Sequence, residues 1–257
     1  MIGTSVLDRF RLDGRTAIVL GAGPGIGAHV SRAFAAVGAN VVVSSRSAER
    51  MEALAAEIRD AGGSALAVAA DAAKADDLAR LVNRAEQAFG PVHILFFNAF
   101  TGPLPIDSDP FAADDAVWEN AFAVNVMAPY RLAKRLVPGM RAAGYGSIIN
   151  LLTCAAFTPI LPQMAYGSTK SALHMLTRYL AKAGGEQVRA NCICPGSISP
   201  DGEVRAAFAE HVRKNAIPRT GLADEVVGAA LLLASPASSY TTGQVIFCEG
   251  GRVSTIA

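Results

Sequence analysis

The sequence predicts an α/β fold in which helices cover both faces of one parallel β-sheet. Apolar runs without polar alternation recur along the chain, and segments of helical composition separate them. Strands that lack such alternation are typically buried on both faces, as in parallel sheets. Strand and helix in regular alternation build βαβ units and a doubly wound sheet. The expected strands cover residues 16–20, 40–45, 65–70, 92–97, 147–152, 188–194 and 244–248.

The helices between these strands are indicated by composition and by their ends. Residues 47–61 are rich in Ala, Leu, Glu and Arg, begin at a serine that can cap a helix, and stop at Gly62. Further helices are expected over residues 28–37, 116–140 and 165–182. No segment rich in Pro, Gly and Ser divides the chain, so residues 1–257 are expected to form a single domain.

Two segments do not fit the regular alternation. Residues 100–110 contain three prolines after a strand, and residues 197–218 begin with the loop-like run SISPDG. Both follow strand ends. Because ligands of open α/β sheets bind outside the carboxyl ends of the strands, we expect these segments to form the walls and lid of a substrate pocket.

Composition argues for a small-molecule partner. Lys and Arg number 23 and Asp and Glu 22, so no basic surface favours nucleic acid or an anionic membrane. The start MIGTSVLDRF contains an acidic residue, and no later stretch reaches the roughly 18 apolar residues of a membrane span. We therefore expect a cytoplasmic protein that contacts neither nucleic acid nor membrane.

Metal binding and serine hydrolysis are both disfavoured. The cysteines lack the paired spacing of a zinc site, and the histidines share no spacing with acids or cysteines. No GxSxG motif is present, which argues against a serine hydrolase. We expect no metal, and we expect reduced, buried thiols. The residues in question are Cys154, Cys192, Cys194 and Cys248, with His29, His93, His174 and His211.

A glycine-rich loop follows the first expected strand. The run GAGPGIG at residues 21–27, with the residue after it, allows two patterns. Gly23, Gly25 and Ala28 fit GxGxxA, whereas Gly21, Gly25 and Gly27 fit GxxxGxG. The second pattern fits better because its first glycine adjoins the strand end. Glycines permit a sharp turn and close approach to a pyrophosphate, which free N–H groups at the helix start can bind. The alternative is a turn that only packs the helix on the strand.

The end of the second strand bears on the choice of dinucleotide. NAD sites usually place Asp or Glu about 20 residues beyond the glycines, where it binds the ribose diol. Here the strand ends with Ser44-Ser45-Arg46. A guanidinium can pair with a 2′-phosphate, so NADP(H) is favoured over NAD(H) and the predicted fold is Rossmann-type. The alternative for Arg46 is a solvated surface residue.

Tyr166 and Lys170, in the run YGSTK, lie one helical turn apart on one face. A phenol with a pKa of about 10 is a poor acid or base at neutral pH, but a nearby ammonium favours phenolate and lowers that pKa. Oxidised nicotinamide adds positive charge. Tyr and Lys four residues apart also occur by chance on amphipathic helices, so the place of the pair after a strand-like segment carries more of the prediction that Tyr166 transfers a proton.

Five motifs follow one another along the chain. They are GAGPGIG, Asn98-Ala99, VNVMAPY around Asn125, YGSTK and Pro195-Gly196. With these motifs in order, the chain resembles the short-chain dehydrogenase/reductase family over nearly its whole length. The resemblance implies that Tyr166 is the general acid/base, that Lys170 lowers its pKa and holds the nicotinamide ribose, and that Asn125 anchors a proton-relay water. It also implies an adenine pocket at Asp71 and Ala72.

The resemblance extends to the individual site residues. Catalytic roles fall to Asn125, Thr153, Tyr166 and Lys170. Thr153 stands where the family has a serine that binds the reacting oxygen, so it keeps the hydroxyl and adds a methyl group. The expected cofactor-binding residues are Gly21, Gly25, Ile26, Gly27, Ser45, Arg46, Asp71, Ala72, Asn98, Ala99, Tyr166, Lys170, Pro195, Gly196 and Ile198.

Other positions depart from the family pattern. This chain has Leu20 where the family usually has threonine, His93 where it often has aspartate, Phe100 in place of the glycine of NAG, and Pro200 where a threonine is common. Phe100 either lies close to the cofactor and pocket entrance or packs beneath the loop that follows it. An apolar pocket for a ring or alkyl chain is indicated by Phe157, Ile160, Leu161, Met164 and Phe208, which equally suit a core or a subunit contact.

The sequence favours an NADP(H)-dependent oxidoreductase acting on a ketone or secondary alcohol. One alternative is a catalytically impaired, cofactor-binding sensor or scaffold, and another is a lyase or dehalogenase on the same fold. By resemblance, we expect a homo-oligomer, a dimer or homotetramer, paired through residues 116–140 and 165–182. Their content of Ala, Leu, Val and Met exceeds what one buried face needs.

Overall fold

The computed structural model describes residues 5–101, 109, 111–161, 163–199, 202–204 and 209–255. Its strand pairs are parallel, and the order of the seven-stranded sheet is 3-2-1-4-5-6-9 by strand number. The predicted doubly wound α/β sheet is therefore confirmed. The strands are β1 (Thr16–Leu20), β2 (Asn40–Ser45), β3 (Ser64–Ala69), β4 (Val92–Phe97), β5 (Gly146–Leu151), β6 (Val188–Pro195) and β9 (Val245–Cys248).

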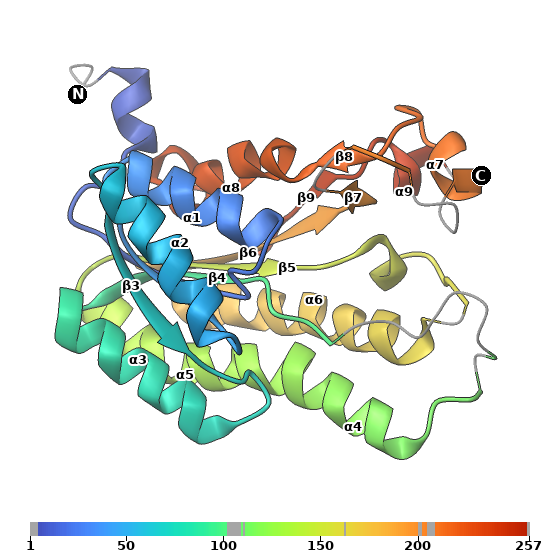
Figure 1. Ribbon diagram of the computed structural model, residues 1–257, viewed down its shortest axis with the longest axis horizontal. Coiled ribbons are helices and arrows are strands. Elements are labelled where there is room, and N and C mark those ends of the chain that lie inside the picture. Colours follow the sequence, from blue (N-terminus) through green and yellow to red (C-terminus); the bar gives the residue numbers. More distant parts are fainter. Residues whose placement is uncertain are drawn as a thin grey trace.

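Helices cover both faces of this sheet, as Figure 1 shows. One face packs against α1 (Ile26–Ala36), α2 (Ala48–Asp60) and α8 (Val227–Ala234). The other packs against α3 (Ala75–Phe89), α5 (Ala128–Ala142) and α6 (Met164–Gly184). Each interface holds its own cluster of buried apolar side chains. The strand order reverses between β1 and β4, which is where ligands of such folds bind.

Burial varies across the sheet. Every residue of the central β1 and of β5 is buried, as apolar runs without alternation predict. The edge strands β3 and β9 are only partly buried, and Phe247 of β9 is 42% exposed. The prediction that every strand is buried on both faces is therefore wrong for the two edges. Edge strands lack a neighbour on one side, so part of their apolar surface stays open.

The helix expected over residues 116–140 is interrupted. It consists of α4 (Asp115–Phe122), a π-helical turn (Ala123–Met127) and α5. Asp114 caps α4 by accepting a hydrogen bond from the Val117 amide at 3.0 Å. A π-helical turn inserts one extra residue and re-aims the side chains that follow, and such turns are frequent at functional sites. Asn125 lies within this turn.

The segment after β6 contains more structure than a loop. β7 (Ile198–Ser199) pairs with β8 (Gly221–Leu222), and short helices form at α7 (Ala209–Arg213) and α9 (Arg252–Thr255). Pro200 and Phe208 lie outside the described residues, as does most of the 100–110 loop. Short 3₁₀ turns complete the described elements at Val6–Phe10, Cys154–Ala156, Ala223–Val226 and Pro236–Ser238.

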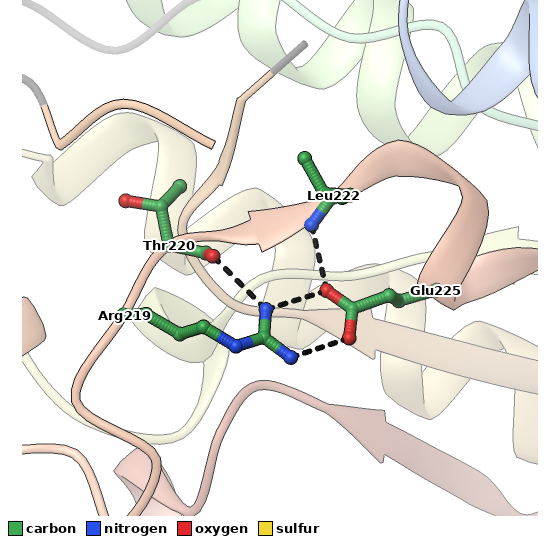
Figure 2. A network of polar contacts seen from close by, with 4 residues as sticks. All are labelled: Arg219, Thr220, Leu222 and Glu225. Carbon is green, nitrogen blue, oxygen red and sulfur yellow. Dashed lines mark hydrogen bonds and ion pairs between the residues drawn. The ribbon is translucent and has the colours of Figure 1, made fainter. Parts of the chain in front are cut away.

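An ion pair joins two residues that flank β8, Arg219 and Glu225 (Figure 2). Both terminal nitrogens of Arg219 donate to the Glu225 carboxylate, at 2.7 and 2.6 Å. The same carboxylate accepts a hydrogen bond from the Leu222 amide at 2.8 Å, and Arg219 also donates to the Thr220 carbonyl at 3.2 Å. These contacts, Arg219 first, lower the pKa of Glu225 to about 2. The carboxylate therefore stays ionised, and the pair persists, at neutral pH.

Three further findings concern the described residues. None of their helices has the length and apolar character to span a bilayer. They contain no group of three or more His, Cys, Asp or Glu side chains placed to hold a metal ion. All four cysteines are free, as expected, and three are buried, but Cys248 is only partly buried because it ends the edge strand β9.

Candidate active site

A groove of about 460 Å³ opens at the carboxyl ends of β1, β2, β3 and β4. It brings together seven of the residues that the sequence predicts for cofactor binding. Gly25, Ile26 and Gly27 adjoin it at the start of α1. The seven lining residues are Gly21, Ser45, Arg46, Asp71, Ala72, Asn98 and Ala99.

The glycine loop is tied to two neighbouring strands. The amides of Gly21 and Ala22 donate to the Ser44 carbonyl, and the amides of Asn98 and Ala99 donate to the Leu20 carbonyl, at 2.8 to 3.0 Å. The Asn98 side chain donates to the Gly21 carbonyl at 2.6 Å. Asn98 therefore fixes the loop, and the loop lies directly above the sheet.

The three glycines of GxxxGxG have different tasks. A Cβ at Gly21 would lie 2.4 Å from the Ala99 nitrogen, and one at Gly27 would lie 2.2 Å from the Gly21 carbonyl oxygen. Gly25 has a φ of 111°, a conformation that other residues rarely adopt, yet no atom lies within 4 Å of its ideal Cβ. Gly21 and Gly27 thus allow close packing, whereas Gly25 shapes the turn and leaves space in front of the helix.

The start of α1 is suited to an anion. The helix has no side-chain cap, and within the described chain no acceptor pairs with the amides of Ile26 and Gly27. Free N–H groups at a helix start attract phosphate by hydrogen bonding and by the helix dipole. Together with the open space at Gly23 and Gly25, these amides fit the pyrophosphate of a dinucleotide.

Substitution of Gly27 by Ala is expected to lower the free energy of unfolding by about 1–3 kcal/mol, because the new methyl group overlaps the Gly21 carbonyl. Gly23→Ala is the matched control. Gly23 lines the groove, lacks a positive φ and has no atom within 4 Å of its ideal Cβ, so its change should stay within about 0.5 kcal/mol. Urea unfolding followed by circular dichroism measures both. Equal losses in the two variants would contradict the packing role of Gly27.

Two arginines face the far end of the groove. Arg46 follows β2, is exposed and has no ion-pair or hydrogen-bond partner among the described residues. Arg50 lines the same groove from the first turn of α2, and its amide donates to the capping Ser47 hydroxyl at 3.3 Å. Sequence reasoning singled out Arg46 and missed Arg50. The position of Arg50, four residues after Arg46, is the sequence feature that could have indicated it. Two unpaired guanidiniums make this end of the groove positive.

The predicted catalytic residues meet at the carboxyl end of β5. Thr153 follows β5, and its hydroxyl accepts a hydrogen bond from the Ala155 amide at 3.4 Å. Tyr166 lies in the first turn of α6. This turn packs closely on the Ala155 carbonyl because Gly167 has no Cβ, which would lie 2.7 Å from that oxygen. Both side chains line a cavity of about 270 Å³. Within this cavity Thr153 acts to lower the pKa of Tyr166, although burial acts more strongly in the opposite direction.

Lys170 is fully buried beneath Tyr166. Its Nζ donates to the Leu151 carbonyl at 2.7 Å and lies 5.9 Å from the centre of the Tyr166 ring. Burial lowers the pKa of Lys170 to about 7, and burial raises the pKa of Tyr166 despite the hydrogen bond from Thr153. The expected lowering of the Tyr166 pKa by Lys170 is therefore wrong for the protein alone. Burial of the phenol, which the sequence does not reveal, is the largest cause of the upward shift of its pKa, and Lys170 is not among the causes.

Asn125 braces the turn of α6 that carries both residues. Its side-chain amide donates to the Thr169 hydroxyl at 3.0 Å, and its carbonyl oxygen accepts from the Thr101 amide at 3.4 Å. The Thr169 hydroxyl in turn donates to the carbonyls of Ala165 and Tyr166, both at 2.9 Å. Thr169 was not singled out from the sequence, although it lies inside YGSTK. Asn125 thus holds α6 against the π-helical turn.

Phe100 lies where the groove meets the cavity. It lines both, is 56% exposed, and its ring centre is 6.0 Å from that of Tyr166. Of the two interpretations offered by the sequence, the structure therefore supports a position at the pocket entrance. Pro195, Gly196 and Ile198 complete the same wall of the cavity.

The apolar residues that could surround the substrate fall into two groups, inside and outside the cavity lining. Ile160 lines the cavity, whereas Phe157 packs on Phe247 and His174 with ring centres 5.0 and 5.4 Å apart. Leu161 is 65% exposed and, like Met164, is not part of the cavity lining. Of the two alternatives that the sequence leaves open, the pocket therefore holds for Ile160, and a packing role outside the cavity holds for Phe157. Spacing along a turn does not show which side chains face inward.

Comparison with known proteins places this geometry in a family. The family model described as enoyl-(acyl carrier protein) reductase matches residues 21–252. The 7α-hydroxysteroid dehydrogenase of Escherichia coli K12 is 34% identical over 254 residues, which cover 96% of this chain and 97% of that protein. The galactitol 2-dehydrogenase of Cereibacter sphaeroides is 36% identical over 252 residues, covering 94% and 96%.

The chain belongs to the short-chain dehydrogenase/reductase family.

Solved structures agree with this assignment. A 7α-hydroxysteroid dehydrogenase complexed with NADH and 7-oxo glycochenodeoxycholic acid has a TM-score of 0.90 and 33% identity, covering 98% of both chains. A gluconate 5-dehydrogenase from Burkholderia cenocepacia with NADP and tartrate has a TM-score of 0.89 and 32% identity, covering 98% of this chain and 100% of the other. This short-chain dehydrogenase/reductase is therefore an oxidoreductase, and both of these solved relatives are bound to a nicotinamide dinucleotide.

Two departures from the family pattern have structural explanations. The Leu20 side chain is buried in β1, while its carbonyl accepts the amides of Asn98 and Ala99. His93 accepts a hydrogen bond from the Thr16 amide through Nδ1 at 3.1 Å, and burial lowers the pKa of its imidazole. The His93 side chain lines neither the cavity nor the groove. In this family member both residues therefore hold the strands that carry the glycine loop.

Proposed function

We propose that this protein transfers a hydride between NADP(H) and a ketone or secondary alcohol, with Tyr166 as general acid/base. The observation that carries the proposal is the placement of the Tyr166 and Thr153 hydroxyls on one cavity, which meets the dinucleotide groove at Phe100. Two hydroxyl groups at one point can bind a single carbonyl oxygen. The comparisons support the oxidoreductase class, and the named residues support the chemistry.

Each residue has one task in this mechanism. A bound nicotinamide dinucleotide supplies or accepts the hydride. Tyr166 gives its phenol proton to the carbonyl oxygen in reduction and takes the alcohol proton in oxidation. Thr153 donates a hydrogen bond to the same oxygen, which stabilises the developing alkoxide. Lys170 holds the nicotinamide ribose, and Asn125 keeps the α6 turn in place.

NADP(H) is the proposed cofactor because Arg46 and Arg50 make the far end of the groove positive. Neither guanidinium has an ion-pair partner in the described part of the chain, so both can bind the 2′-phosphate that distinguishes NADP from NAD. Asp71 lines the groove, but its carboxylate accepts a hydrogen bond from the Ala73 amide at 3.0 Å. It therefore shapes the bend after β3, where we place the adenine.

Arg46→Ala is expected to weaken NADP binding by about 10- to 100-fold, the range for a lost hydrogen bond to a charged group, and to leave NAD binding unchanged. Isothermal titration calorimetry with each dinucleotide measures the ratio of the two affinities. Arg84→Ala is the control, because Arg84 is exposed on α3 and does not line the groove. An unchanged ratio in Arg46→Ala, or a wild type that prefers NAD, would remove the assignment.

We also propose that the protein forms a homo-oligomer through α4, α5 and α6. Large apolar side chains on these helices and the π-helical turn are 38–69% exposed, which is more apolar surface than a solvated helix face usually shows. Closed symmetry with two-fold axes is the common outcome for such surfaces. The side chains concerned are Phe122, Met127, Tyr130, Met175 and Tyr179.

A further inference from the structure

The catalytic cavity is lined by chemically different groups. Thr153 and Tyr166 carry hydroxyls, and several other lining side chains are apolar. The cavity is also lined by polar or charged groups that the proposed proton transfer does not use, chiefly from the β7–β8 region and the chain after β9. These are Gln163, Glu203, His211, Thr220 and Arg252. Among the described lining residues, Arg252 is the one whose side chain is cationic at any ordinary pH.

The chain is folded so as to bring Arg252 to the cavity. Gly250 and Gly251 have φ values of 69° and 81°, and they turn the chain sharply after β9 into α9, which begins at Arg252. A Cβ at Gly251 would lie 2.6 Å from the Ala216 Cβ, so the turn also packs against the neighbouring segment. The Ile217 amide donates to the Gly250 carbonyl at 2.9 Å. The start of α9 is thereby fixed beside the cavity.

Arg252 is half-buried and has no counter-charge within the part of the chain that the structure describes. No carboxylate lies within ion-pair distance of its guanidinium among the described residues, although Arg219 is paired with Glu225 in bidentate fashion. The buried carboxylate of Glu249 accepts a hydrogen bond from the Val253 amide at 2.7 Å and does not pair with Arg252. Glu203, on the same cavity, already has an interaction partner.

A partly desolvated cation without a partner favours an anionic ligand. The guanidinium has given up part of its hydration, and a carboxylate can restore two charge-assisted hydrogen bonds in the planar fork that Arg presents. The apolar side chains of Phe100, Ile160, Pro195 and Ile198 on the same cavity can cover a carbon skeleton. A cavity of about 270 Å³ accepts a compact molecule.

We propose that the substrate is an oxo acid, or the corresponding hydroxy acid, whose carboxylate binds Arg252 while its carbonyl or hydroxyl group meets Tyr166 and Thr153. This inference rests on the proposed function and adds the substrate class. The carboxylate takes no part in the chemical step. Arg252 orients the substrate, so it acts on substrate binding and selectivity.

The experiment compares straight-chain oxo acids of increasing length, each with its methyl ester, using NADPH consumption as the readout. Wild type is expected to reduce at least one acid with a kcat/KM about 10- to 100-fold above that of its ester. In Arg252→Met this ratio should fall to about one, because kcat/KM for the acid falls far more than kcat/KM for the ester. Added salt should lower the preference for the acid.

Control variants separate charge from structure. Arg252→Lys keeps the charge without the planar fork and should retain part of the preference. Arg84→Met, on α3, removes an exposed arginine outside the cavity and should behave as wild type. Wild type that reduces acids and esters equally, or a Met variant that keeps the preference, overturns the proposal.

Failure of the proposed function gives a different experimental result from failure of the Arg252 proposal. If no acid, ester or neutral ketone consumes NADPH, the hydride-transfer proposal fails, and calorimetry on the NADP complex still tests Arg252. Oxo-acid binding to wild type that is lost in Arg252→Met supports the anion site. Absence of binding to wild type, or equal binding to both proteins, overturns it.

Discussion

Tyr166→Phe is expected to abolish hydride transfer while leaving the fold and dinucleotide binding intact. The substitution removes only the hydroxyl that gives its proton to the developing alkoxide, and loss of a general acid typically lowers the rate by a factor of about 10² to 10⁴. Turnover is measured by NADPH absorbance with any substrate found in a screen, and NADP binding by calorimetry. Tyr179→Phe is the control, because Tyr179 lies on the same helix and is 69% exposed.

The pH dependence tests the same role. Oxidation needs the phenolate, so its rate should rise with pH as Tyr166 ionises, and reduction needs the phenol, so its rate should fall over the same interval. Burial raises the pKa of Tyr166 in the protein alone. We therefore expect the ultraviolet titration of the free protein to place this phenol above ordinary tyrosine, and saturation with oxidised NADP to lower its pKa.

Two results would contradict this mechanism. A Tyr166→Phe protein as active as wild type would exclude Tyr166 as the proton donor. A wild type that binds NADP yet reduces no substrate would instead favour the cofactor-binding sensor or scaffold.

Thr153→Val is expected to lower kcat by about 10² to 10³, the usual cost of losing one donor to a developing oxyanion. Valine has nearly the same shape as threonine but cannot donate a hydrogen bond, whereas Thr153→Ser keeps the donor and should retain substantial turnover. Steady-state kinetics of the three proteins separate the hydroxyl from the methyl group.

Thr153 also caps a short turn, so stability needs its own control. The hydroxyl accepts the Ala155 amide, and Thr153→Val loses this contact along with the catalytic one. Thermal unfolding of each variant shows whether the turn persists, and Thr158→Val tests a threonine of the same segment that does not line the cavity. Wild-type kcat in the Thr153→Val protein would mean that another group binds the substrate oxygen.

The fold was predictable because burial is encoded in short apolar runs. All seven strands of the sheet begin and end within one residue of the predicted positions, since a buried run stops where the chain reaches solvent. The Ser47 cap and the glycine loop also match, because both depend on local chemistry. The π-helical turn at Ala123–Met127 was not predicted, because one inserted residue leaves the composition of the helix unchanged.

The site was predictable where it follows strand ends. Gly21 and Arg46 come directly after a strand and Thr153 comes shortly after one, and parallel strands deliver their ends to one edge. Contacts between distant segments were not predictable. The direction of the Lys170 amine toward Leu151 and the position of Arg252 beside the cavity depend on tertiary packing.

The ion pair between Arg219 and Glu225 is contained within residues 219 to 225, which include none of the proposed catalytic groups. Arg219 also binds the carbonyl of Thr220, a residue of the cavity wall. This part of the wall is therefore stabilised by contacts of its own, and we expect a side-chain replacement at Thr220 to leave the α6 turn and the glycine loop in place. Substrate preference then becomes adjustable separately from the proposed proton transfer.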